Sequence, residues 1–369
     1  MQTDSTEPIT TGDRFLLIGG FVLLGAGIIE GLGAQWDIQW HTVVGPDTFF
    51  TAPHLMLYIG IAAGGFTALA VVLRNTFAGP GRDAVTGHTV RVFGTFAAPV
   101  GFLIAGLGAA GQLLYGLSDL WWHEVYGFDA TLTSPPHIAM SLCSMTTAIG
   151  GVVVFAALRR YRAGRLGLVL ATANVLSGMV ILVLALLPFM GWTGFVLATI
   201  GVATMGPMLV AAVLRAPWWP ILTGLIYSLL LALAWVFAPW ATAAYAASVG
   251  LPMRDFADNS VVQLVLLEPW GVLLGALLLE LGLRVARSRN IAPRRAVPVL
   301  GALLAVALTM SYAVQLNGAG IGAVIFVGSL PVGAVAGWLA WYWGAGLRRL
   351  DATGQQPTTI RDDLVRQEA

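Results

Sequence analysis

The sequence contains no lysine and has little charge of either sign. Only 10% of its 369 residues are charged, all 19 basic residues are arginine, and the formal net charge is +1. Because no basic face can accumulate, we expect no nucleic-acid partner. The single cysteine, Cys143, excludes an internal disulfide bond. A chain of this length with 57% hydrophobic residues is also unlike an ordinary soluble domain.

Long apolar runs recur along the whole chain. A helix of about 20 apolar residues spans a hydrocarbon core of ~30 Å. We therefore predict an all-α polytopic integral membrane protein of the cytoplasmic membrane, surrounded by the lipid bilayer, with about ten transmembrane helices. The spans are expected near residues 15–35, 54–74, 92–117, 136–158, 166–189, 194–214, 218–239, 261–283, 297–317 and 321–346.

The arginines predict how these spans are oriented. Nearly all of them fall in the even-numbered connections and in the C-terminal tail, and Arg254 is the exception in an odd-numbered connection. Arginine is enriched in cytoplasmic loops of membrane proteins. We therefore predict that both chain termini are cytoplasmic and that the odd-numbered connections lie on the extracytoplasmic side.

Four of the five histidines lie in two copies of one motif, at residues 37–54 and 119–137. Both copies fall in odd-numbered connections, the first and the third, so we predict that they lie on the extracytoplasmic side. One residue is inserted in the second copy before its final Pro-His pair. Before that insertion Asp37, Trp40, His41, Val43, Gly45 and Asp47 match Asp119, Trp122, His123, Val125, Gly127 and Asp129 without a gap.

The positions of the copies predict a tandem repeat of two helical hairpins that point the same way. Residues 1–165 would form this duplicated metal-binding module. Residues 166–350 would form a six-helix transmembrane region, which contains no histidine, and residues 351–369 a polar cytoplasmic tail. The long connection at 239–260 is predicted on the same side as the motifs and is expected to cover them.

The spacing within each copy favours a metal site. Asp37 and His41 are four residues apart, as are Asp119 and His123, so each pair would project from one face of a helix. The last histidine of each copy follows a proline, which favours the first turn of the returning helix. Each hairpin would thus offer one carboxylate and two imidazoles. The six predicted ligands are Asp37, His41, His54, Asp119, His123 and His137.

Two imidazoles and a carboxylate leave open positions on a metal and suit copper, zinc or iron. Asp47 and Asp129 are predicted to orient ligand histidines from behind. Glu30 lies two helical turns before Asp37, and we expect it to support the site or to carry protons. A lone histidine or tryptophan near a membrane interface is more often an anchor than a ligand. The duplication in register favours the metal site, because ionisable residues at membrane depth are costly and usually functional.

The pattern Asp-x3-His-x12-His, with Trp40 directly before its first histidine and Phe-Thr-x-x-His at its end, resembles the C subunit of the copper-containing membrane monooxygenases, the family of particulate methane and ammonia monooxygenases. The second copy resembles that subunit's second site, which has Asn-x3-His-x13-His. The resemblance covers roughly residues 15–158. It implies two copper sites formed by the six residues above, and partner subunits of the monooxygenase type. Asp119 replaces the usual asparagine, and the six trailing spans have no counterpart in that subunit.

Three functions follow from these patterns. The first is a copper-dependent membrane monooxygenase, or a subunit of one, that oxidises a small apolar substrate with O2. The second is a membrane metal transporter or metallochaperone, although the six later spans carry few of the polar residues that line transport paths. The third is a scaffold with structural metal sites that assembles as a homo-oligomer. Metal content and turnover would separate them.

Overall fold

The structure is a computed structural model that describes residues 9–45, 48–77, 89–127, 132–254 and 263–350. Helices make up nearly all of it, and the strands form one short antiparallel pair. In chain order the elements are α1 (Thr11–Val43), α2 (Ala52–Phe77), β1 (Thr89–Val92), β2 (Phe96–Pro99), α3 (Val100–Tyr126), α4 (Pro135–Ala157), α5 (Arg162–Ala185), α6 (Leu187–Leu214), α7 (Trp219–Val249), α8 (Gln263–Leu266), α9 (Val272–Ser288), α10 (Pro293–Gln315) and α11 (Ala323–Arg349).

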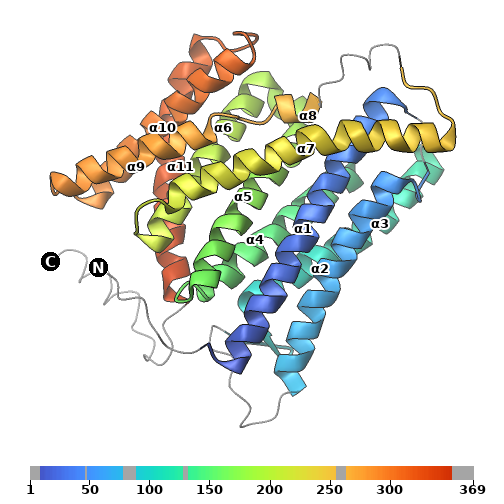
Figure 1. Ribbon diagram of the computed structural model, residues 1–369, viewed down its shortest axis with the longest axis horizontal. Coiled ribbons are helices and arrows are strands. Elements are labelled where there is room, and N and C mark those ends of the chain that lie inside the picture. The colour runs from blue at the N-terminus through green and yellow to red at the C-terminus, as the bar shows by residue number, and fades with distance from the viewer. Residues whose placement is uncertain (1–8, 46–47, 78–88, 128–131, 255–262, 351–369) are drawn as a thin grey trace.

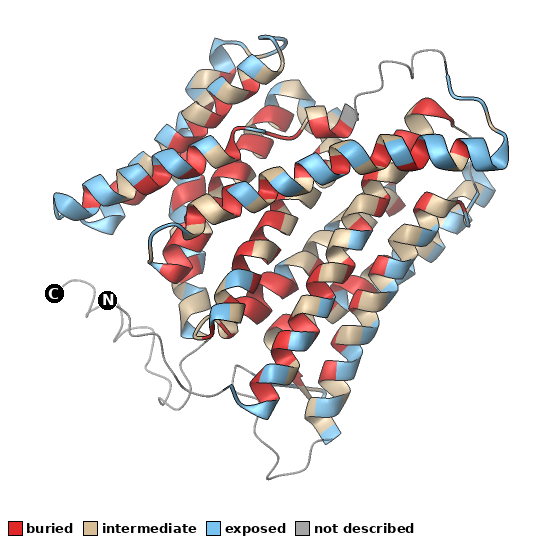
Figure 2. Ribbon diagram, viewed as in Figure 1, coloured by how far each residue is buried: buried red, intermediate tan, exposed pale blue. Residues whose placement is uncertain are grey.

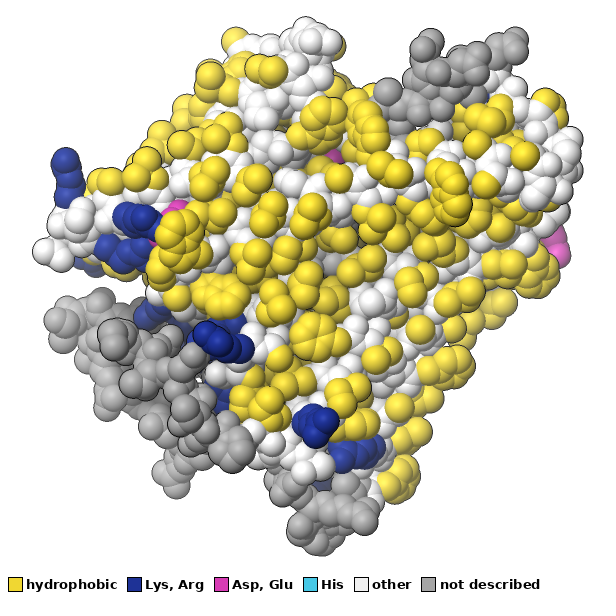
Figure 3. All heavy atoms as spheres, in the orientation of Figure 1, with side chains coloured by type: hydrophobic (Ala, Val, Ile, Leu, Met, Phe, Trp, Pro, Cys, Tyr) yellow, Lys and Arg dark blue, Asp and Glu magenta, His cyan; other side chains and the backbone are white. Residues whose placement is uncertain are grey.

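The helices confirm an all-α multi-pass membrane protein. Within the described ranges, nine helices are long and apolar enough to cross a bilayer. Hydrophobic side chains cover the broad face shown in Figure 3, and arginines gather towards its lower and left margins. Residues towards the middle of the bundle are buried, as the red segments of the ribbon in Figure 2 show. Apolar surface thus faces outwards as well as inwards, which suits a protein surrounded by lipid.

The predicted span at 261–283 is wrong as a continuous helix. In its described part the chain forms the four-residue α8, a break, and then the 17-residue α9. Pro269 lies in the break, where its missing N–H and its ring prevent the helix from continuing. The Gln315 side chain donates hydrogen bonds to the carbonyls of Leu266 (2.8 Å) and Glu268 (2.7 Å), which the break would otherwise leave unpaired.

Other predicted spans also differ in their bounds: the helix expected to end near residue 35 continues to Val43, so that Asp37 and His41 lie within α1. The helix expected from residue 92 begins at Val100, because residues 89–99 form the β1–β2 hairpin. The helix expected to end at Pro239 continues to Val249, so α7 contains much of the connection predicted at 239–260. The boundary expected near residues 189–194 is a kink at Gly191 inside α6, where φ is 66°.

Two hairpins, α1–α2 and α3–α4, pack side by side on one flank of the bundle (Figure 1). Helix α5 packs against α1, α4, α6 and α7, and α11 packs against α6 and α10. In Figure 1, α7 crosses the front of the bundle obliquely and reaches the outer end of α1. The six-helix region is therefore in direct contact with the first hairpin.

The even-numbered connections meet at one end of the bundle. Arg160, after α4, forms an ion pair with Asp13 at the start of α1. Arg159 donates hydrogen bonds to the backbone carbonyls of Leu347 and Arg348 at the end of α11. Cation–π contacts join further residues of this end: Arg74 with Phe15, Arg215 with Trp341, and Arg284 with Trp218. Asp37 and Asp119 lie near the C-terminal ends of α1 and α3, away from these arginines. That the arginine end is cytoplasmic stays a prediction.

Candidate metal centre

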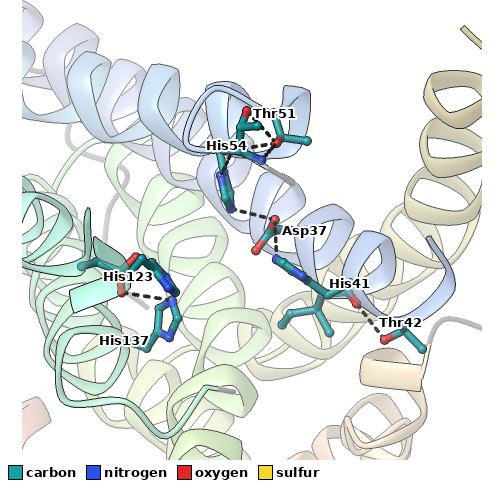
Figure 4. A network of polar contacts seen from close by, with 10 residues as sticks. Asp37, His41, Thr42, Thr51, His54, His123 and His137 are labelled. Atoms are coloured by element: carbon teal, nitrogen blue, oxygen red, sulfur yellow. Dashed lines mark hydrogen bonds and ion pairs between the residues drawn. The ribbon is translucent and has the colours of Figure 1, made fainter. Parts of the chain in front are cut away.

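The first group of predicted ligands comes from both helices of the first hairpin. Asp37 and His41 lie four residues apart near the C-terminal end of α1 and share one face. His54 lies in the first turn of α2. Its Nε2 atom is 3.1 Å from Asp37 Oδ1, and Nε2 of His41 is 3.6 Å from the same oxygen. Figure 4 shows the two imidazoles reaching Asp37 from two sides.

The second group has the same composition and comes from the second hairpin. Asp119 and His123 lie near the C-terminal end of α3, and His137 lies in the first turn of α4. Nε2 of His123 is 3.4 Å from Asp119 Oδ2, and Nε2 of His137 is 3.4 Å from Asp119 Oδ1. All six residues predicted as ligands are thus brought together, three in each hairpin.

Hydrogen bonds on the far side of the rings determine which nitrogen faces each aspartate. Nδ1 of His54 lies 3.0 Å from the carbonyl oxygen of Thr48, and Nδ1 of His123 lies 3.3 Å from that of Gly127. A carbonyl oxygen can only accept, so in both neutral rings Nδ1 carries the proton. Nε2 then presents its lone pair towards the carboxylate. Hydrogen bonds of this kind orient metal-binding histidines.

Each group therefore places electron-pair donors close together. The candidate ligand atoms of each set lie within 4.8 Å of one another. Asp37 Oδ1 and Asp119 Oδ1 are buried and accept no hydrogen bond, although imidazole nitrogens lie 3.1 and 3.4 Å away. Buried acceptors that face one another are stabilised by a cation between them, either a metal ion or a proton on Nε2 of an imidazole. The arrangement fits a metal ion, and each group can hold one.

Sequence reasoning missed the residues that orient the rings. Ser134 caps the N-terminus of α4, and its hydroxyl lies 2.8 Å from Nδ1 of His137. The Ser-Pro-Pro start of that helix is a recognisable capping pattern, so the signal was present. The Thr48 carbonyl is a backbone group and carries no such signal. Asp47 and Asp129, predicted for this role, lie outside the described residues.

Both groups line one cavity of about 550 Å³. Its wall includes all six candidate ligands together with apolar side chains of α1, α2 and α4. Asn174 and Ile181 of α5, and Leu230 and Ala234 of α7, also line it. The cavity therefore joins the two groups, and the six-helix region contributes to its wall.

Glu30 lies in the same cavity wall but does not touch a candidate ligand. Its Oε1 atom accepts hydrogen bonds of 2.6 Å from Gln112 Nε2 and from Ser144 Oγ. Gln112 precedes Asp119 by seven residues, as Glu30 precedes Asp37, so equivalent positions of the two copies meet here. The side chain is 7% exposed. Glu30 therefore connects the two hairpins, and its expected support of the site or transport of protons stays a prediction.

No protein-family model matches this chain, and no curated protein or solved structure matches it either.

Proposed function

We propose that the protein binds copper in its two Asp-His-His groups and oxidises a small apolar substrate with O2, either alone or with partner subunits. The observation that carries the proposal is the pair of ligand sets on one cavity. Each set offers two imidazoles and one carboxylate, which suits copper and leaves positions open. The spacing that resembles the monooxygenase C subunit, x12 in the first copy and x13 in the second, favours copper over zinc or iron.

The overall reaction would convert substrate, O2, two electrons and two protons into hydroxylated substrate and water, with an external reductant supplying the electrons. Bound copper would supply the redox chemistry with O2. The protein's part is to hold each ligand set by hydrogen bonds behind the rings, such as that from His54 to Thr48. Apolar cavity residues such as Leu57 and Ile61 would admit an apolar substrate and limit water.

Turnover of the full chain in lipid tests this proposal. O2 consumption that depends on a reductant and on a small hydrocarbon is expected from the wild type. His54→Ala and His137→Ala each remove one ligand, so each should lower the rate by at least about tenfold. His88→Ala is the matched control, because His88 is the histidine outside both motif copies. Full turnover in both ligand variants would contradict the proposal.

Metal transport is the second candidate, and one observation favours it. The cavity extends from the two ligand sets to Glu30 and Asn174, which places polar groups along a path into the bundle. Copper flux into liposomes, lost in the same two histidine variants, would support transport. Substrate-dependent O2 consumption without copper flux would favour the monooxygenase.

A further inference from the structure

The outer end of α1 is held by a buried polar contact that precedes the first ligand. Gln35 lies two residues before Asp37, and its Nε2 atom donates a 2.8 Å hydrogen bond to Oε1 of Glu268. Glu268 lies in the break between α8 and α9 and is fully buried. Tyr227 of α7 donates a 3.2 Å hydrogen bond to its other oxygen. This contact fixes the rotation of α1 against the six-helix region.

Aromatic contacts hold the same turn of α1. The ring of Tyr245, on α7, lies 6.0 Å from that of Trp36 and 4.9 Å from that of Trp40. Trp36 immediately precedes Asp37, and Trp40 immediately precedes His41. Trp40 is 1% exposed, so its packing against α7 is close. Each candidate ligand on α1 thus directly follows a tryptophan that packs against α7.

Arg254 completes the contact at the last turn of α1. Its backbone N–H donates to the carbonyl of Val43 (2.8 Å), and its Nη1 donates to that of Thr42 (3.1 Å). A cation at a helix C-terminus is stabilising. Gly45 leaves room for this side chain, because a Cβ there would lie 2.5 Å from Arg254 Nη2. The arginine that broke the topology pattern is therefore a helix cap.

Among the residues that the structure describes, none makes the equivalent contacts with the end of α3. At the position equivalent to Gln35, α3 has Leu117, which is 57% exposed. Val125 is the counterpart of Val43 and is 54% exposed. A Cβ at Gly127, the counterpart of Gly45, would meet nothing within 4 Å. The described ring contacts of Trp121 and Trp122 are with Tyr126 of the same helix. Helix α3 packs mainly on α2 and α4.

We infer that the six-helix region, through Gln35–Glu268, Tyr245 and Arg254, preorganises the first Asp-His-His group, so that the first group binds metal more tightly than the second. The inference rests on the proposed metal binding. A ligand set that is already held loses less conformational freedom when the metal binds. Gln35, Glu268, Tyr245 and Arg254 are positioning residues and contribute no ligand atom. This gives the six-helix region a part in the site.

Two variants isolate the groups in the full chain. His123→Ala leaves only the first group complete, and His41→Ala leaves only the second. Competition of Cu(I) between each protein and a chromophoric chelator gives the two affinities. We expect the first to be tighter by about tenfold or more, the range by which residues behind metal ligands act.

Glu268→Ala, added to each background, then tests the cause. We expect a loss of about 10–100-fold in the first group and less than about twofold in the second. Glu268→Gln keeps a side-chain carbonyl that can accept from Gln35, so it should restore the affinity. The Cu(II) EPR signal of the first group should shift in Glu268→Ala and return in Glu268→Gln. The matched control is Glu280→Gln. Glu280 is also a buried carboxylate, but it forms ion pairs with Arg284 and Arg287 and not with α1.

Arg254→Ala is a second test in case Glu268→Ala does not fold, because Arg254 lies at an exposed position. We expect it to lower the metal affinity of the first group alone, by a few-fold. The inference would be overturned by equal Cu(I) affinities of the two single-group proteins, or by equal losses of affinity when Glu268→Ala is added to each. The proposed metal binding would still stand. Absence of metal from the wild type would overturn the proposed function and the inference with it.

Discussion

The two Asp-His-His groups have the same ligands in the same order but hold them differently. In the first, a single oxygen of Asp37 faces both imidazoles, whereas in the second each oxygen of Asp119 faces one. The ring of His54 is oriented by a backbone carbonyl, and that of His137 by the hydroxyl of Ser134. The motif thus determines which atoms meet, and residues outside it determine how firmly they are held.

The largest effect should come from removing metal. Without a cation, each group leaves a buried carboxylate oxygen facing imidazole nitrogens. Metal at a thousand times its dissociation constant stabilises the folded state by about 4 kcal/mol per site. We expect chelator-treated protein to melt at a clearly lower temperature, and added Cu(I) to restore stability in two steps, one per group. A melting temperature that does not change on stripping would contradict occupied sites.

Asparagine substitutions should separate the two aspartates. In Asp37→Asn, the single oxygen that faces both imidazoles loses its negative charge. A metal bound between them then loses its anionic ligand. In Asp119→Asn, the amide carbonyl can still bind the metal beside one imidazole, and only the oxygen that faces the other imidazole is lost. We expect a loss of metal affinity of about 100-fold in the first and about tenfold in the second. Chelator competition measures both, and a larger loss in Asp119→Asn would reverse the comparison.

Ser134→Ala should affect only the second group. It removes the hydroxyl that orients His137, and a hydrogen bond of this kind contributes roughly 0.5–1.5 kcal/mol, or about two- to tenfold in affinity. Ser118→Ala is the control, because that hydroxyl bonds to the Leu114 carbonyl of its own helix. An unchanged affinity of the second group in Ser134→Ala would show that the ring is oriented by other contacts.

The smallest expected effect is a difference in thermal midpoint between substitutions at two glycines. Gly45 and Gly127 both have positive φ, 107° and 83°, so alanine should cost each about 1 kcal/mol in backbone strain. At Gly45 the added Cβ also collides with Arg254. We expect Gly45→Ala to lower the thermal midpoint more than Gly127→Ala. Arg254→Ala should remove the excess in a double-mutant cycle. Equal midpoints would argue against the Arg254 contact.

Local patterns predicted much of this molecule from its sequence. Apolar runs gave nine of the spans, and the i, i+4 spacing and the Pro-His pairs placed all six candidate ligands, because each depends on residues close in the chain. The break at Pro269 was missed because hydropathy does not register where a helix stops. The Gln35–Glu268 contact was missed because it joins residues 233 apart in the sequence. Nothing local to either residue indicates its partner.

Metal content, with EPR, of protein purified without chelators tests the central claim most directly. The wild type should contain two copper ions per chain, and His41→Ala and His123→Ala should each lose one, together with a different part of the EPR signal. His88→Ala should keep both. Zinc alone, or no metal in any of these proteins, would contradict the account.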